Sequence, residues 1–296
     1  MKWFQIKEQA AGEKRLILSW HLYKIFGKNI LYVIACLVSF FTFIFSKKIR
    51  NYSKKYFCIT EPYTNVKPNL INQFMHIFSY AQTLVDKILV YSGDFNADDL
   101  IFESENDKEL LFSDIKQDKG VFFICSHIGN IEVLQSFFLS KNTRVNNDIN
   151  IFMSHKQSQI FNNFLKKIQI PFPVKLYPVE DIGLNTGIEL KENLDKGGIV
   201  FIAGDRISEN NNNKNIETKL FNHKIFLPKG TFKLAELMDV QTYFVSAVKT
   251  GSKYKIYYEK QNNLNNNDLV KQYTQFLEKM VRITPFQFFH FYDFFN

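Results

Sequence analysis

Short apolar runs alternate with amphipathic segments along most of the chain from residue 100 onward. The apolar runs, each as long as a buried strand, cover residues 121–125, 149–153, 174–179, 199–203 and 243–248. Between them, apolar residues recur every three or four positions over residues 130–140, 157–168, 184–194 and 231–238, which is the spacing of amphipathic helices. Strands that alternate with helices in this way are typical of an α/β domain. We therefore predict an α/β fold with a mixed, mostly parallel central sheet flanked by helices.

Further elements are expected on both sides of this pattern. Residues 69–91 have helical spacing, and a strand at 254–258 and a helix at 268–282 follow the alternating region. The chain has 296 residues, of which 46% are hydrophobic, enough to bury a core and to exclude disorder as the main state. No segment after residue 60 is long enough to serve as a linker. We therefore predict a single domain over residues 61–296.

The N-terminal part contains an apolar stretch of a different kind. Residues 30–46 (ILYVIACLVSFFTFIFS) are 17 residues without a charge, flanked by Lys28, Lys47, Lys48 and Arg50. A helix that crosses a bilayer needs about 20 apolar residues, with about 17 at the lower limit. The stretch could therefore be a short span, a helix in the membrane interface, or a buried core helix. Its basic and aromatic flanks favour contact with an anionic membrane.

The net charge of the protein is concentrated in this same region. The whole chain carries +8, and nine basic residues with no Asp or Glu lie between Lys14 and Thr60. Residues 61–296 hold 26 basic and 27 acidic groups and are nearly neutral. A nucleic-acid binder should carry its basic residues over the folded domain, so no nucleic acid is expected as a partner. We predict that residues 1–60 form a segment that associates with anionic membrane lipids.

Polar residues follow two of the predicted strands. Ser126 and His127 come after the run 121–125, and Asp205 and Arg206 come after the run 199–203. Ligands of open α/β sheets bind outside the carboxyl ends of the strands. His127, Asp205 and Arg206 are therefore expected to share one crevice if the two strands are neighbours.

His127 is the strongest candidate for acid–base chemistry. It opens the segment His-Ile-Gly-Asn-Ile-Glu, in which Gly129 and Asn130 indicate a turn before a helix. Glu132 then falls in the first helical turn, where a carboxylate is favoured and could reach back to the imidazole. A histidine oriented by a carboxylate is the unit that activates a hydroxyl or an amine. On spacing alone, a structural histidine at a strand end remains the simpler interpretation.

Other reactive groups give weaker signals. Cys125 lies two residues before His127, so a Cys–His nucleophile is conceivable, although a cysteine in a buried strand is more often inert. The three cysteines are too far apart for a disulfide framework, and the histidines have no zinc-site spacing. The chain lacks the glycine-rich signatures of dinucleotide and P-loop sites.

Several blocks in order resemble a known family. SHIGNIEVL at 126–134 resembles the H-x4-D/E block of the lysophospholipid acyltransferase superfamily, and more narrowly its bacterial branch of lipid A biosynthesis late acyltransferases. GDRI at 204–207, LPKGTFKLAELMDVQTYFV at 227–245, and the aromatic tail at 277–295 resemble later blocks of that branch. The N-terminal WHLYKIFGK also fits, so the resemblance covers nearly the whole chain. The sequence departs from the pattern in an asparagine-rich segment at 209–215, and at Phe288 and Phe289 where tryptophan is expected.

The resemblance implies specific roles at the catalytic centre. His127 would act as general base on the acceptor nucleophile as it attacks the thioester of an acyl donor, and Glu132 would hold and polarise His127. Asp205 would be a positioning residue. Asn130, after Gly129, would donate to the oxyanion or cap the next helix. The family resemblance implies no metal, no cofactor besides the acyl donor, and no obligatory acyl-enzyme.

The resemblance also implies anion binding near the catalytic centre. Arg206 would bind a phosphate of the donor or the acceptor, since guanidinium binds anions in a bidentate manner; the alternative is an ion pair with Asp205. Lys229 and Gly230, at a predicted helix start, would help to hold the donor's phosphate, or would simply form a turn.

The function expected from these observations is membrane-associated acyl transfer. The donor would be acyl carrier protein or coenzyme A carrying an acyl thioester, and the acceptor a hydroxyl or amine of a lipid or glycolipid. We expect the enzyme at the bacterial inner (cytoplasmic) membrane with its catalytic domain on the cytoplasmic side. The alternatives are a thioester or ester hydrolase that uses the same His127, and a non-catalytic lipid-binding protein.

Overall fold

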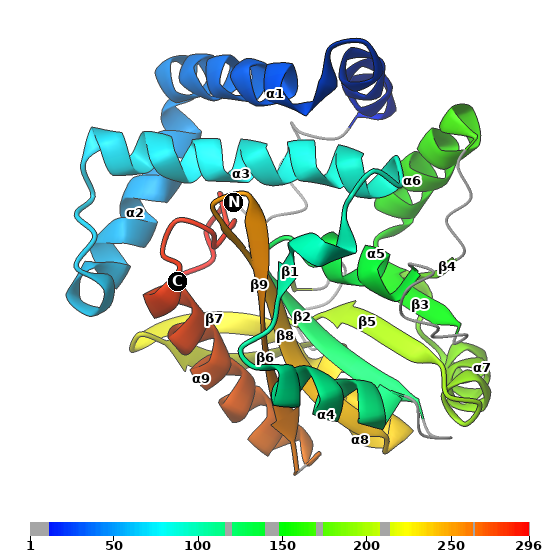
Figure 1. The fold of residues 1–296 in the computed structure, drawn as a ribbon. Coiled ribbons are helices and arrows are strands. Elements are labelled where there is room, and N and C mark those ends of the chain that lie inside the picture. The colour runs from blue at the N-terminus through cyan, green and yellow to red at the C-terminus, as the bar shows by residue number, and fades with distance from the viewer. Residues whose placement is uncertain are drawn as a thin grey trace.

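A seven-stranded sheet forms the centre of the protein (Figure 1). The computed structural model describes residues 12–115, 120–139, 148–169, 174–207, 214–262 and 264–295, so most of the asparagine-rich segment lies outside the described residues. The sheet order is β1 (Leu100–Ile101), β9 (Lys253–Gln261), β8 (Gln241–Thr250), β2 (Val121–Gly129), β5 (Ile199–Ala203), β3 (Ile149–Met153) and β4 (Val174–Pro178). The last five strands are parallel to one another, whereas β9 is antiparallel to β8. The predicted mixed, mostly parallel sheet is thus confirmed.

The helices cover both faces of this sheet. They are α4 (Glu105–Ile115), α5 (Glu132–Leu139), α6 (His155–Ile168), α7 (Leu184–Leu194), α8 (Lys229–Met238) and α9 (Asn266–Ile283). One face packs on α7, α8 and α9, and the other packs on α4, α5 and α6 together with α3 (Leu70–Tyr91). Both faces of the central strands are buried, which is why those strands read as continuous apolar runs.

Some described elements were not predicted from the sequence. These are short β1, the 3₁₀ turns η2 (Ala97–Asp99) and η3 (Val179–Asp181), and helices α2 (Lys47–Thr64) and α4. Of the two helices, only α4 is weakly amphipathic. The hairpin of β6 (Asn215–Leu220) and β7 (His223–Pro228) turns through Phe221 and Asn222, both left-handed. A phenylalanine in that conformation is unusual, so the turn has no recognisable sequence signal.

The apolar stretch at 30–46 lies in α1 (Glu13–Phe45) except for its last residue, Ser46, which caps the helix. The helix bends at Gly27, where φ is 74°. After the bend, Leu31, Ala35 and Ser39 are buried and the helix runs along α3, as Figure 1 shows. The remaining faces expose a set of large apolar side chains: Ile30, Val33, Leu37, Val38, Phe40, Phe41, Ile44 and Phe45. By length and composition alone, α1 is apolar enough to cross a membrane. Among the described residues, this part of α1 is therefore packed against α3 on one side and exposes apolar side chains on the others.

The boundary predicted between residues 60 and 61 falls inside α2. Tyr56 and Phe57 of α2 belong to the same core as the sheet residues Phe122 and Phe244. Whether residues 61–296 fold independently stays a prediction.

A buried charge fixes α1 and α3 to the sheet. Asp86 of α3 is 2% exposed and accepts hydrogen bonds from Tyr32 of α1 and Tyr254 of β9. Lys249 of β8 places its Nζ 2.7 Å from the Asp86 carboxylate and over the rings of both tyrosines. A buried ion pair is tolerated when its remaining hydrogen-bonding positions are filled in this way. Four elements therefore depend on one carboxylate.

We expect Lys249→Met to lower the free energy of unfolding by about 3 kcal/mol, because it leaves the Asp86 charge buried without its cation. Lys279→Met is the matched control, since the Lys279–Glu259 pair is also short, at 2.6 Å, but exposed. The control should lose less than about 1 kcal/mol. Denaturant unfolding in detergent measures both values. Equal losses would show that the Asp86 site adds nothing beyond a surface pair.

Candidate active site

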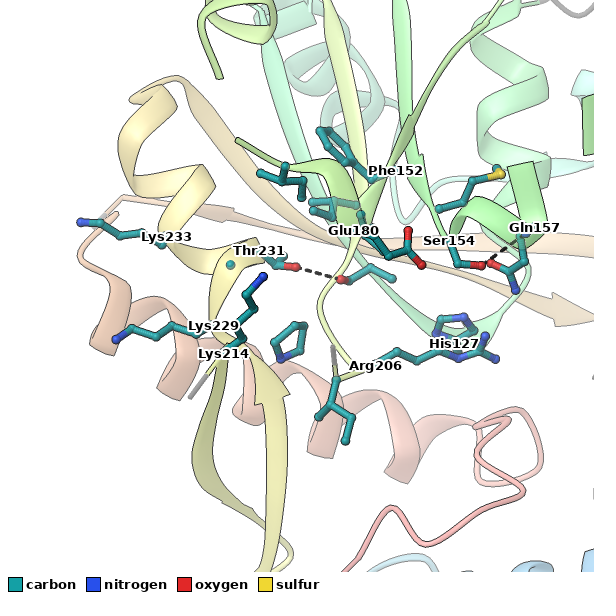
Figure 2. A pocket seen from close by; sticks show the side chains of 18 residues that line it. His127, Phe152, Ser154, Gln157, Glu180, Arg206, Lys214, Lys229, Thr231 and Lys233 are labelled. Atoms are coloured by element: carbon teal, nitrogen blue, oxygen red, sulfur yellow. Dashed lines mark hydrogen bonds between the residues drawn. The ribbon is translucent and has the colours of Figure 1, made fainter. Parts of the chain in front are cut away.

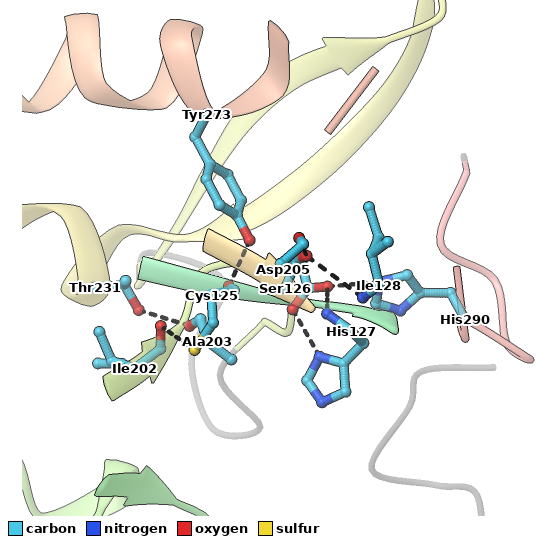
Figure 3. Close-up of polar contacts among 11 residues, drawn as sticks. Cys125, Ser126, His127, Ile128, Ile202, Ala203, Asp205, Thr231, Tyr273 and His290 are labelled. Atoms are coloured by element: carbon cyan, nitrogen blue, oxygen red, sulfur yellow. Dashed lines mark hydrogen bonds and ion pairs between the residues drawn. The ribbon is translucent and has the colours of Figure 1, made fainter. Parts of the chain in front are cut away.

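The carboxyl ends of β2 and β5 lie side by side. The two strands are neighbours in parallel register, with Cys125 opposite Ala203, and Gly204 N donates to the Cys125 carbonyl at 2.9 Å. His127, near the end of β2, and Asp205, just after β5, therefore lie at the same edge of the sheet (Figure 3). His127, Asp205 and Arg206 are thus brought together as predicted, with His127 and Arg206 lining a common cavity and Asp205 buried behind the imidazole.

Asp205 holds His127 through two hydrogen bonds. The Nδ1 atom of His127 lies 2.7 Å from Asp205 Oδ1, and the backbone N–H of His127 donates to Oδ2 at 2.5 Å. Asp205 is fully buried, whereas 29% of the His127 side chain is exposed. Because an ionised carboxylate only accepts, the proton of a neutral His127 lies on Nδ1. Its Nε2 is then the unprotonated, basic nitrogen.

The electrostatic environment keeps His127 in that basic form. Burial and the nearby Arg206 charge lower the pKa of His127 below its ordinary value, and the Asp205 carboxylate opposes that shift. Burial by itself would raise the pKa of Asp205, but the interactions with His127 and His290 outweigh it and hold that pKa well below the usual range. At neutral pH the site thus pairs a neutral imidazole with a carboxylate.

Glu132 does not occupy the expected place beside His127. Its carboxylate lies 2.5 Å from Nζ of Lys87 on α3, and Asp205 takes the position at the imidazole. Burial alone would lower the pKa of Lys87, but the Glu132 charge outweighs this and raises it. A largely buried ammonium needs a counter-charge more than a neutral imidazole does. The expected Glu132–His127 contact is therefore corrected, while a role for Glu132 in catalysis stays a prediction.

Gly129 and Asn130 shape the turn after His127. Gly129 has a φ of 71°, and a Cβ there would lie 1.9 Å from the Ala247 carbonyl, so only glycine fits. The backbone N–H groups of Gly129 and Asn130 donate to the Gln287 and Ala247 carbonyls. The Asn130 side chain is buried, donates to Thr83 O at 3.4 Å, and lines neither cavity described below. Both backbone N–H groups are thus already paired within the protein, and the Asn130 side chain lies away from both cavities.

Two cavities meet at His127. The larger, of about 430 Å³, is lined by the predicted residues Arg206, Lys229 and Gly230 and also by Lys214 and Lys233 (Figure 2). The three lysines gather at one end of this cavity, and His127 and Arg206 lie at the other. Most of its wall is nevertheless apolar, and Glu180 adds one carboxylate, so the cavity is an apolar chamber with basic groups at both ends.

The second cavity, of about 220 Å³, lies among α3, α5 and α6. His127 and Arg206 also line this cavity, together with Gly129 and the Lys87–Glu132 pair. Apolar side chains make up much of the rest of its wall: Leu16, Leu84, Ile131, Ile160 and Phe161. His127 is thus accessible from two largely apolar cavities, of which the larger also carries Lys214, Lys229 and Lys233.

Cys125 has the environment of a structural residue. Its thiol is buried, donates to the Ile202 carbonyl, and burial raises its pKa. A protonated thiol is a poor nucleophile.

Among the described residues, no group of three or more His, Cys, Asp or Glu side chains could hold a metal ion. Acid–base chemistry at His127 is what this arrangement can perform.

Two functional candidates escaped the sequence analysis. Lys87 lies on the predicted helix 69–91, but nothing in the helical spacing distinguishes it from a surface lysine. His290 lies in the aromatic tail, and its Nε2 is 3.0 Å from Asp205 Oδ2. Its only sequence signal is that it is a polar residue within an apolar tail. The spacing of residues does not show where that tail lies in the fold.

Residues 15–296 match the protein-family model described as bacterial lipid A biosynthesis acyltransferase. No curated protein matches the chain significantly. The matched range includes His127, Asp205, Arg206 and the tail that carries His290.

We expect Asp205→Asn to lower the pKa of His127 still further, because the carboxylate that favours the imidazolium is lost. Glu132→Gln should change that pKa much less, since Glu132 is paired with Lys87. NMR titration of histidines labelled with ¹³C at Cε1 measures both values. A larger change in the Glu132 variant would return Glu132 to the role of partner of His127.

Proposed function

The chain belongs to the bacterial lipid A biosynthesis acyltransferase family, and from that premise we propose its reaction in detail. The enzyme moves an acyl chain from the thioester of an acyl carrier protein or coenzyme A to a hydroxyl or amine of a lipid or glycolipid. The observation that carries the proposal is the unprotonated Nε2 of His127 at the junction of two cavities. One cavity suits each of the two substrates.

The donor would occupy the larger cavity. Both proposed donors carry the thioester on an arm with phosphate, and Lys214, Lys229 and Arg206 offer positive charge along that wall. Lys229 also begins α8, whose N-terminal end is favourable for an anion. The thioester carbonyl would then reach His127 from the larger cavity.

The acceptor would enter through the smaller cavity, whose largely apolar wall suits a lipid. Its hydroxyl or amine would face His127 near the Lys87–Glu132 pair, which can hydrogen-bond a polar head group. Space for a second substrate beside the thioester favours transfer over hydrolysis, which requires room only for water.

The proton would move through His127 in both halves of the reaction. Nε2 removes the proton from the acceptor as its oxygen or nitrogen attacks the thioester carbonyl. Asp205 stabilises the imidazolium, and Arg206, which lines both cavities, is placed to stabilise negative charge on the carbonyl oxygen. Collapse of the tetrahedral intermediate breaks the C–S bond, and the imidazolium protonates the departing thiolate. Neither step needs an acyl-enzyme.

The apolar face of α1 would bind the bacterial inner membrane from the cytoplasmic side. Because one side of α1 is packed on α3, we propose that the helix lies in the interface and inserts its exposed side chains, such as Phe41 and Phe45. The flanking Lys28, Lys47 and Lys48 would meet anionic head groups.

His127→Ala should abolish acyl transfer, with a loss of at least about a thousandfold in kcat/KM, because both proton transfers are lost. Mass spectrometry of the lipid product after incubation with acyl carrier protein or coenzyme A thioesters measures the reaction. His223→Ala, at an exposed histidine of β7, should keep full activity. If the product is free fatty acid and no acylated lipid, the protein is a hydrolase rather than a transferase. If neither product forms, a lipid-binding protein is favoured.

Replacing Leu37, Phe41 and Phe45 together by glutamate should release the protein from phosphatidylglycerol vesicles, because charged side chains do not enter the acyl region. All three side chains are exposed, so the fold should survive. Leu184→Glu is the control, since Leu184 is an exposed apolar residue of α7. Vesicle co-sedimentation reports binding. Retention of the triple variant would place the membrane contact elsewhere.

A further inference from the structure

The aromatic tail pairs with the strand end that carries His127. Ile128 and Phe288 form an antiparallel bridge, and Phe289 N donates to the His127 carbonyl at 3.0 Å. The Gln287 side chain exchanges two hydrogen bonds of 2.9 Å with the backbone of Lys249 on β8. The tail is therefore held in a fixed register at the active site.

This register places His290 beside Asp205 Oδ2, whereas Oδ1 faces the His127 imidazole. The His290 side chain is only 2% exposed, and its Nε2 is 3.0 Å from Asp205 Oδ2 (Figure 3). Its ring stacks on Phe294 with centroids 4.2 Å apart, and the edges of Phe288 and Tyr292 enclose it. The aromatic neighbours thus fix the direction of the Nε2–H bond.

The carboxylate of Asp205 has two distinct sides. Oδ1 accepts from the His127 imidazole, and Oδ2 accepts from the His127 backbone and from His290. We propose that His290 is a positioning residue for the reaction: its Nε2–H holds Oδ2 so that Oδ1 stays aligned with Nδ1 of His127. The inference rests on the proposed role of His127 as general base, which it deepens.

The role requires His290 to be a neutral donor, and its surroundings favour that state. Burial lowers the pKa of His290 to about 4, although Asp205 opposes the shift. The other titratable or charged groups around it are His127, Arg206, His76 of α3 and Tyr292 of the tail. Its Nδ1 meets no hydrogen-bond donor among the described residues, which leaves the proton on Nε2.

Neutrality matters because His127 becomes a cation during turnover. A protonated His290 would compete with that imidazolium for the charge of Asp205. A neutral N–H orients the carboxylate and leaves its negative charge for His127. His290 therefore acts through Asp205 and touches neither substrate.

A pair of variants of similar shape separates this role from packing. The His290→Gln variant keeps an amide N–H near the position of Nε2, whereas His290→Met keeps the bulk and removes the donor. We expect His290→Met to lower kcat about tenfold to a hundredfold, the effect of losing a hydrogen bond to a charged group. His290→Gln should stay within about threefold of the native enzyme.

The pH profile gives a readout that packing alone would not move. Without the His290 donor, the charge of Asp205 is less dispersed and favours the His127 imidazolium more strongly. The acid limb of kcat/KM should therefore move to higher pH in His290→Met and stay in place in His290→Gln. NMR titration of His127 in the same variants measures the shift independently of turnover.

His76→Met controls for disturbance of the tail. His76 is also buried and contacts the Phe288 carbonyl through Nε2 at 2.9 Å, and its interactions do not include a hydrogen bond to Asp205. The His76→Met substitution should lower the free energy of unfolding without moving the acid limb of the kcat/KM profile. Equal pH profiles for the two His290 variants, or the same shift in His76→Met, would overturn the positioning role.

The proposed function is judged separately on the native enzyme. A native protein that transfers no acyl group, or a fully active His127→Ala, would remove the general base itself. Only the inference about His290 would be rejected if the native enzyme is active, His127→Ala is inactive, and the two His290 variants behave alike.

Discussion

The Asp205 carboxylate is buried between two imidazoles, and the active site depends on how its charge is satisfied. It accepts three hydrogen bonds, two from His127 and one from His290. Those donors come from β2 and from the C-terminal tail, while the carboxylate follows β5. A buried carboxylate without such donors would be protonated or displaced. The sheet order that makes β2 and β5 neighbours is therefore a requirement of the chemistry, as well as of packing.

The same principle operates at the half-buried charge of Lys87 and the buried charge of Asp86. Lys87 is compensated by Glu132, and Asp86 is compensated by Lys249 and two tyrosines. The first pair lines the smaller cavity beside His127, whereas the second ties α1 and α3 to the sheet. Lys87 and Asp86 both lie on α3, whereas Asp205 is held by β2 and the tail. Polar groups inside this fold thus act as connections between elements that the apolar core alone would not hold in register.

The sequence predicted the fold well and the contacts of the site only in part. Apolar runs and helical spacing identified the sheet strands from β2 onward and their helices, because both faces of a central parallel sheet must be apolar. The strand ends also marked His127, Asp205 and Arg206 as neighbours on the condition that their two strands are adjacent, which the sheet order fulfils. Proximity in sequence pointed to Glu132 as the partner of His127, but the partner is 78 positions away. Pairing in the sheet, rather than local spacing, decides which carboxylate reaches the imidazole.

The distances along the chain between the joined residues have a consequence for folding. Asp205 is 78 positions from His127 and 85 from His290, and the tail contact of His76 spans 212 positions. Contacts of such long range form late, because the entropy of closing the intervening loops must be overcome first. A partly folded chain that lacks either the β2–β5 pairing or the docked tail has the histidine without its oriented carboxylate. The proposed reactivity of His127 would therefore arise only with the complete tertiary structure, and local opening at the tail would remove it before the rest of the protein unfolds.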